Sequence, residues 1–319
     1  MGIEYMTVMP KSFAMRISSV LALLALCACG RNVGGANADA LTAARADSQD
    51  SSTNTVQSMV SSINQSAALA ESVGGVAPSG LNAFSGTCPS SRSVCMVNTR
   101  TVSYADCSLG RYSVNGSANL NYDSAATCAT ASTTRPISGS VTRTTAGLVL
   151  TVPNNAGVLQ VTSNSATAYN GEAVGGGARV SFNGANTYSI AILGLNRTRY
   201  ANDGLRIFDH SVKTASDLQV SGSFAGRDRM MSSGSVVLHH NRLQFTATTV
   251  VNSLLWNDLG CCHPRRGTMT STLRNLTGAT LETWTIDFGV AGLNCGQVRA
   301  DITKDGIAQT STLTLPDCE

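Results

Sequence analysis

The chain has 319 residues, a formal net charge of +3 and only 13% charged residues. A charge this close to zero lacks the field that steers proteins toward nucleic acids, so no nucleic-acid partner is expected. Aromatic residues make up 5% of the chain and glycine occupies 30 positions. This composition is typical of many short strands joined by tight turns, and it argues against the usual helical and α/β enzymes.

The N-terminal segment carries an uncharged apolar run that ends in two cysteines. Lys11 and Arg16 precede the run, which covers residues 17–26. Basic residues followed by apolar and then small residues are the layout of a secretory signal peptide. The run is too short for a membrane span, which needs about 20 apolar residues. The sequence therefore predicts export, with cleavage near the end of this run.

The end of the run, Leu26-Cys27-Ala28-Cys29, resembles the lipobox of bacterial lipoproteins, with Cys29 as the modified residue. Cys27 does not fit that role, because Leu26 is too large for the position before the cut. The resemblance implies cleavage after Ala28 and a covalent lipid on Cys29, with no other cofactor. Two or three acyl chains hold a protein firmly on a membrane. Gly30 follows instead of aspartate, which by the family's sorting rule implies the outer membrane. An ordinary signal peptide is the alternative.

The sequence divides into four parts. Residues 1–28 are the expected signal peptide, and residues 29–52, almost free of large apolar side chains, are a flexible tether. Residues 53–75 are expected to form an amphipathic helix that covers the sheet, since apolar residues recur there at helical spacing before Gly74-Gly75. Residues 76–319 are expected to form a disulfide-braced antiparallel β domain.

Eight cysteines remain for this domain, in two groups of four separated by a cysteine-free stretch, 129–260. They are Cys88, Cys95, Cys107 and Cys128, then Cys261, Cys262, Cys295 and Cys318. An even number in an exported chain predicts disulfides. We expect pairing within each group, with Cys261 and Cys262 bridged to Cys295 and Cys318.

Beyond Pro78 the apolar residues alternate with polar ones, and turn signals separate the alternating segments. The alternating pairs include Ile190 with Ile192, Leu218 with Val220, Val236 with Leu238, Leu243 with Phe245, and Trp284 with Ile286. Turn signals include Asn183-Gly184, Asn202-Asp203-Gly204 and Asp305-Gly306. The fold class is therefore mainly β: a long antiparallel meander with one N-terminal helix. A curved sheet wrapped on that helix, a sandwich, a β-roll and a closed barrel all fit the pattern.

The segment WNDLGCCHPRRG, residues 256–267, looks most like a site, since it combines cysteines, a histidine and two arginines. Adjacent cysteines beside His263 cannot easily wrap one metal ion, because zinc sites use spaced ligand pairs. A disulfide corner is therefore preferred to a metal or redox site. Neighbours in a strand face opposite ways, so His239 and His240 cannot share a metal. They and His210 are expected to be structural or surface residues, and no metal site is predicted.

Two further motifs are interpreted as turns. Gly175-Gly176-Gly177 lacks the lysine and the helix of a phosphate loop. The run GRDRMM, residues 226–231, places two arginines around Asp228 and is expected to be a solvated hairpin loop in preference to a carboxylate or sugar site. No G-x-S-x-G nucleophile motif occurs, so no catalytic residue is predicted.

These observations favour a lipoprotein anchored in the outer membrane, facing the periplasm or the cell surface, with a non-catalytic binding or scaffolding domain. The expected partners are the membrane, through the anchor, and an envelope protein, glycan or lipid. The alternative function is a carrier that holds a lipid or acyl chain in an apolar groove between the curved sheet and the helix. A hydrolase of the envelope is a third and weaker hypothesis.

Overall fold

The computed structural model describes residues 90–109, 112–123, 138–151, 157–184, 186–222, 229–256, 261 and 263–315. The expected signal peptide, Cys29, the tether and the helix at 53–75 lie outside these residues, as do Cys88, Cys128, Cys262 and Cys318. None of the described residues forms a helix long and apolar enough to cross a membrane.

The described part of the chain is built from β-strands. They are β1 (Ser91–Arg92), β2 (Thr99–Leu109), β3 (Tyr112–Tyr122), β4 (Ser138–Thr151), β5 (Val158–Thr162), β6 (Ala166–Thr167), β7 (Ala173–Val174), β8 (Gly177–Asn183), β9 (Thr187–Tyr200), β10 (Arg206–Ser221), β11 (Arg229–His240), β12 (Phe245–Trp256), β13 (Arg266–Asn275), β14 (Thr280–Asp287), β15 (Gln297–Lys304) and β16 (Ile307–Thr314).

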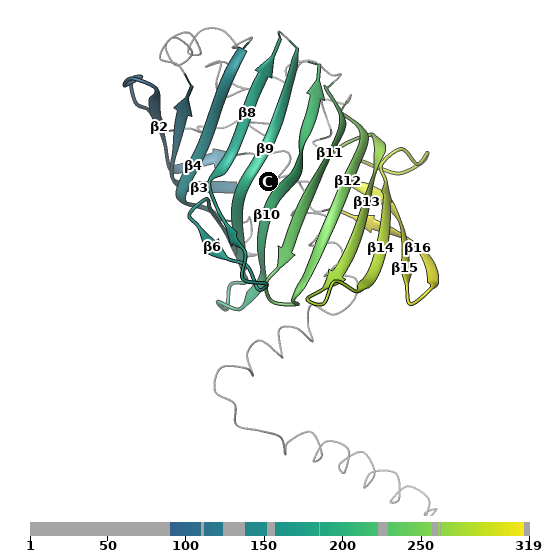
Figure 1. Cartoon of the computed structure of the whole chain (residues 1–319). Coiled ribbons are helices and arrows are strands. Elements are labelled where there is room, and N and C mark those ends of the chain that lie inside the picture. The colour runs from purple at the N-terminus through teal and green to yellow at the C-terminus, as the bar shows by residue number, and fades with distance from the viewer. Residues whose placement is uncertain are drawn as a thin grey trace, which may run out of the picture. The chain divides into compact units, whose positions relative to one another are not determined.

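Fourteen strands form one antiparallel sheet, in which most strands pair with their neighbours in sequence (Figure 1). The order is β1-β2-β3-β4-β5-β9, continuing without interruption to β16, while β6 and β7 form a separate two-stranded sheet. The antiparallel meander is thus confirmed. Since one large sheet carries the fold, these residues do not form the sandwich, which needs two large sheets. Figure 1 shows both ends of the sheet bending back behind its central strands.

One position in the sheet is shared by two short strands. The first half of β4 pairs with β8 and its second half with β5, and β9 pairs with the same two strands. β5 and β8 therefore lie end to end between β4 and β9. The chain between them, residues 163–176, leaves the sheet and carries β6 and β7. We call this segment the strap.

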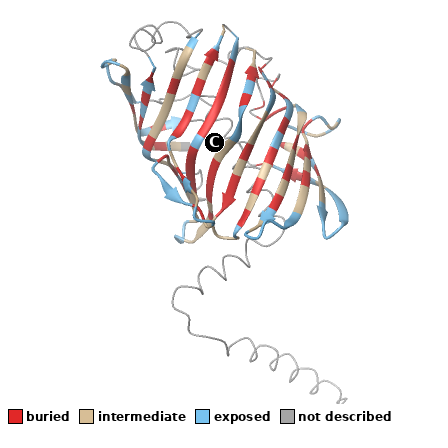
Figure 2. Ribbon diagram, viewed as in Figure 1, coloured by how far each residue is buried: buried red, intermediate tan, exposed pale blue. Residues whose placement is uncertain are grey.

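The alternation seen in the sequence gives the sheet one dry face, because successive side chains of a strand point to opposite faces. In β12, Phe245, Ala247, Thr249 and Val251 are buried and their neighbours are more exposed. The same pattern extends across the sheet, so that buried residues run in rows over the strands (Figure 2). The largest fully buried side chains include Trp284, Tyr188, Phe208, Ile190 and Leu218.

The predicted turns are partly confirmed. Asn202-Asp203-Gly204 lies between β9 and β10, and Asp305-Gly306 joins β15 to β16 with positive φ angles of 51° and 76°. The strand expected around Leu243 is wrong at that residue. Leu243 lies in the turn between β11 and β12, where it is partly buried and packs against the core, so its apolar character reflects burial and not alternation.

Candidate functional site

Polar side chains of the four strands β9 to β12 gather beneath the strap, and this cluster is the candidate site. The ends of the strap are held together, since the Gly176 N–H donates to the Ser163 carbonyl at 2.8 Å. The Ser163 hydroxyl accepts from the Thr145 N–H at 2.6 Å and donates to the Thr145 carbonyl at 2.9 Å. The strap therefore leaves and re-enters the sheet at a point fixed by β4.

The strap lies directly against the backbone of β9. A Cβ added to Gly194 would lie 2.1 Å from the backbone nitrogen of Gly175, far inside van der Waals contact. Only glycine allows this approach, because any side chain at position 194 would push the strap away from the sheet. The third glycine of the predicted turn, Gly177, is the first residue of β8.

Asn196 of β9 fastens both sides of the strap. Its side-chain amide donates to the carbonyls of Asn164 at 2.9 Å and Val174 at 3.0 Å. Its carbonyl oxygen accepts from the hydroxyl of Ser211 on β10 at 2.8 Å. Asn196 and Ser211 are 7% and 0% exposed. A buried amide with three such partners has its hydrogen-bonding capacity largely satisfied.

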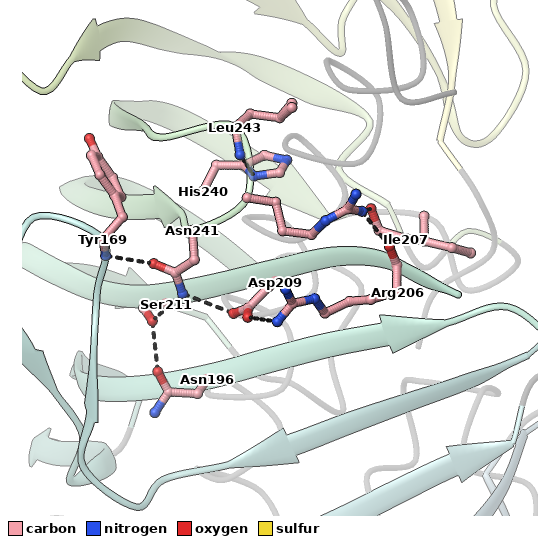
Figure 3. A network of polar contacts seen from close by, with 10 residues as sticks. Tyr169, Asn196, Arg206, Ile207, Asp209, Ser211, His240, Asn241 and Leu243 are labelled. Atoms are coloured by element: carbon pink, nitrogen blue, oxygen red, sulfur yellow. Dashed lines mark hydrogen bonds and ion pairs between the residues drawn. The ribbon is translucent and has the colours of Figure 1, made fainter. Parts of the chain in front are cut away.

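The network continues to the turn after β11 (Figure 3). The side-chain amide of Asn241 donates to the Ser211 hydroxyl at 3.2 Å and to Oδ1 of Asp209 at 2.9 Å. Its carbonyl oxygen accepts from the backbone N–H of Tyr169 in the strap at 3.1 Å. Arg206 pairs with the second carboxylate oxygen of Asp209 at 2.9 Å. One chain of contacts thus joins the strap, β9, β10 and the β11–β12 turn.

A second set of contacts centres on Glu172 in the strap. Its carboxylate pairs with the ammonium group of Lys213 on β10 and lies 3.3 Å from Nε2 of His239 on β11. Nδ1 of His239 lies 3.3 Å from the Thr246 hydroxyl, which is 2.8 Å from the Tyr169 hydroxyl. Burial, and secondarily the charge of Lys213, lowers the pKa of His239.

The order Glu172, His239 and Thr246 has the composition of a nucleophile triad, but its surroundings favour a structural role. His239 is only 2% exposed, and the Thr246 hydroxyl is already bonded to Tyr169. A catalytic nucleophile needs an accessible position in front of its base. Here the three groups connect the strap to the sheet.

The opposite face holds a second histidine cluster. His210 and His240 occupy directly paired positions on β10 and β11, and their ring centroids are 4.5 Å apart. The ring of Phe208 stacks on His210 at 4.5 Å, and that of Phe245 lies 4.8 Å from His240. On the other side of β10, Arg197 of β9 occupies the strand position directly opposite His210.

Both of these histidines are held neutral. Burial is the main cause that lowers the pKa of His210, followed by the charges of His240 and Arg197. Burial, followed by the charge of Arg242, lowers the pKa of His240 to about 3. The Leu243 N–H donates to Nδ1 of His240 at 3.2 Å, which matches a neutral ring protonated on Nε2. Across the described residues, no group of three or more His, Cys, Asp or Glu side chains is placed to hold a metal ion.

The cysteine-rich segment contains one disulfide, between Cys261 and Cys295, whose Cα atoms are 5.5 Å apart. Both residues belong to the second predicted group, so this bridge has the expected kind of pairing. Cys95 and Cys107 are each disulfide-bonded as well. His263 is 5% exposed and packs beside Gly296, where an added Cβ would lie 3.2 Å from its ring.

The expected solvated loop around Asp228 is wrong for its C-terminal part. Arg229 is the first residue of β11 and is 3% exposed. Its guanidinium carbon lies 4.0 Å from the ring centroid of Trp256, the residue it faces on β12. The arginine is therefore buried by stacking on a neighbouring strand, a cross-strand contact that the local sequence does not reveal.

Sequence reasoning placed His239 and His240 on opposite faces but missed the pairing of His210 with His240 and the role of Asn196. The two histidines become opposite each other only through the register of β10 with β11, which shifts between Thr214 and Val220. No local signal marks Asn196, because its partners are strap carbonyls.

Comparisons of the chain with known protein families, with curated proteins and with solved structures gave no match.

Proposed function

We propose that the chain is a lipoprotein of the outer membrane, anchored by acyl chains on Cys29, whose β domain is a non-catalytic scaffold or binding module of the cell envelope. The observation that carries this proposal is that the side chains of the polar cluster are engaged in contacts within the protein. Asn196, Ser211, Asn241 and Glu172 are engaged with the strap or with each other. Such a cluster stiffens a surface instead of offering reactive groups to a substrate.

The Cys261–Cys295 disulfide supports placement in an oxidising compartment, where such bridges persist. It crosses between the segment before β13 and the segment before β15, so it ties together consecutive parts of the last strands. A braced sheet at the end of a flexible tether suits a module that presents one rigid surface to an envelope protein, a glycan or a lipid.

The buried face of the sheet supports a filled core, which favours the scaffold over the alternative function as a lipid carrier. Val212, Leu238, Ala247 and Ile286 are all 0% exposed, whereas an open acyl-chain groove would leave its lining accessible. Native mass spectrometry of the purified chain tests this point directly. Retention of a phospholipid or a free fatty acid would favour the carrier.

Metabolic labelling with palmitate tests the anchor. The full chain and the Cys27→Ser variant should be labelled and should sediment with outer membranes, whereas Cys29→Ser should be unlabelled. Cys27→Ser is the matched control, since it removes a neighbouring thiol from the same apolar run. Labelling that persists in Cys29→Ser, or that disappears in Cys27→Ser alone, would show that the anchor is assigned to the wrong residue.

A further inference from the structure

The last strand of the sheet, β16, has an outer edge with which no other described strand pairs. It pairs with β15 over its whole length, from Ile307 to Thr314, without a bulge or register shift. The pairing of β14 with β15 is equally regular. Many other pairs in the sheet, including those of β10 with both its neighbours, contain register shifts. The sheet therefore ends in a straight and regular edge.

The register fixes which backbone groups of β16 face outward. Asp305-Gly306 forms a two-residue hairpin turn, so Lys304 and Ile307 exchange hydrogen bonds, and every second residue of β16 does the same with β15. The Leu315 N–H, which donates to the Gly296 carbonyl at 2.7 Å, continues this series of odd-numbered residues. The N–H and C=O groups of Ala308, Thr310, Thr312 and Thr314 consequently point away from the sheet.

This edge lacks the devices that normally prevent strands from joining. Edge strands are usually protected by charges, proline, a bulge or shortness. The sequence of β16, IAQTSTLT, contains no charged residue and no proline. The other edge of the sheet, β1, is only two residues long. Among the described residues, the sheet thus has one short edge and one long, uncharged edge.

We propose that β16 pairs antiparallel with β16 of a second copy of the chain, around a two-fold axis at Ser311. Outward-facing residues must meet outward-facing residues, and the register that uses all four sets Thr310 opposite Thr312 and Ala308 opposite Thr314. Ser311 then faces its own counterpart. An uncharged strand meets its copy without like-charge repulsion, which favours self-pairing.

The same geometry limits the assembly to two copies. An interface that uses the same strand from both partners is closed by its two-fold axis. Continued growth would need a second regular edge of similar length. Among the described residues the opposite edge consists of the two-residue β1 and of β2, whose pairing with β3 shifts register between Tyr104 and Cys107. The expected species is therefore a dimer with one continuous sheet, and not a fibre.

Oxidative cross-linking tests the register. In a non-hydrogen-bonded antiparallel pair the Cα atoms are about 4.5 Å apart, within the range of a disulfide. The purified full chain with Ser311→Cys, treated with copper phenanthroline, should give a covalent dimer on a non-reducing gel. Gln309→Cys is the matched control. It faces Leu313 of the other copy, which puts the two introduced thiols about 13 Å apart, so it should cross-link no more than the unmodified chain.

Blocking the edge tests the pairing itself. Thr312→Pro removes an outward N–H without breaking a bond to β15, and Thr312→Lys places a charge at the interface. Both variants should sediment with the mass of a single chain, while the unmodified chain and Thr303→Lys, which adds the same charge on β15, should sediment with twice that mass. Circular dichroism checks that each variant is folded. A single-chain mass for the unmodified protein, or equal cross-linking at positions 309 and 311, would overturn the proposal. The test does not depend on the lipid anchor.

Discussion

The imidazole rings of His210 and His240 lie 4.5 Å apart on neighbouring strands, and both face the buried side of the sheet. They are 0% and 2% exposed. Because water cannot solvate a charge at this position, folding favours the neutral form of both rings. Two adjacent rings also disfavour each other's protonation, so acid should act strongly on this part of the core.

The first prediction concerns the pH dependence of stability. The folded-state pKa of His240 is about 3, below the ordinary value of about 6.5, so the unfolded chain binds the proton more tightly. The free energy of unfolding should be highest above about pH 6.5 and fall as the pH drops toward 3, by up to about 1.4 kcal/mol per pH unit for each such histidine. Urea unfolding between about pH 7 and pH 4 measures this slope.

The variant His240→Gln provides the control, because it carries no titratable group at that position. Carboxylates contribute to the slope in both proteins, so the difference between the two slopes isolates the histidine. The variant should have the shallower dependence. Identical slopes would mean that His240 does not titrate differently in the folded and unfolded chains.

The second prediction concerns Asn196. Replacement by alanine leaves the carbonyls of Asn164 and Val174 and the Ser211 hydroxyl without their partner. Leaving buried polar groups unsatisfied costs about 1–3 kcal/mol, so the midpoint of urea unfolding should fall clearly. Asn119→Ala removes an exposed contact with Thr101 and should change the free energy of unfolding by less than about 0.5 kcal/mol.

The third prediction compares two glycines. Gly194→Ala introduces a methyl group where the Gly175 nitrogen would be 2.1 Å away, whereas a Cβ on Gly147 would meet nothing within 4 Å. Gly194→Ala should destabilise the protein and expose the strap to limited proteolysis, and Gly147→Ala should do neither. Equal protease resistance in the two variants would contradict the close packing of the strap on β9.

The fourth prediction concerns the disulfide. The bridge between Cys261 and Cys295 closes a loop with a sequence separation of 34, for which chain entropy gives a stabilisation of about 3–4 kcal/mol. The double variant Cys261→Ala, Cys295→Ala avoids an unpaired thiol and should lower the free energy of unfolding by this order. Treatment with a reductant should then lower the melting temperature of the unmodified chain more than that of the double variant.

Many strands of the sheet could be predicted from the sequence. Apolar residues that alternate with polar ones, such as Trp284 and Ile286 or Val236 and Leu238, indicate a strand with one buried face. Alternation does not report which strands pair. The sharing of one position by β5 and β8 therefore could not be predicted, since it depends on where the strap closes.

The candidate site was harder to predict from the sequence, for a related reason. His210 and His240 meet only through the register of β10 with β11, and that register shifts at Thr214, Ser216 and Gln219. Each shift of one residue would turn a side chain to the other face. A hairpin drawn from the sequence alone thus leaves the facing of these rings undecided. Asn196 donates hydrogen bonds to backbone carbonyls of the strap. The residue pattern of the sequence does not reveal where a backbone segment packs on the sheet.

The division of one strand position between β5 and β8 also bears on how the chain folds. Most pairings join strands that follow each other, so they can form as successive local hairpins. Two pairings instead join distant parts of the chain, Ser138 with Asn183 and Val158 with Tyr200. Their formation requires the closure of long loops, which is the slow and entropically costly step in β proteins. The sheet is therefore expected to assemble from two locally formed halves, with the region around the strap completing it last.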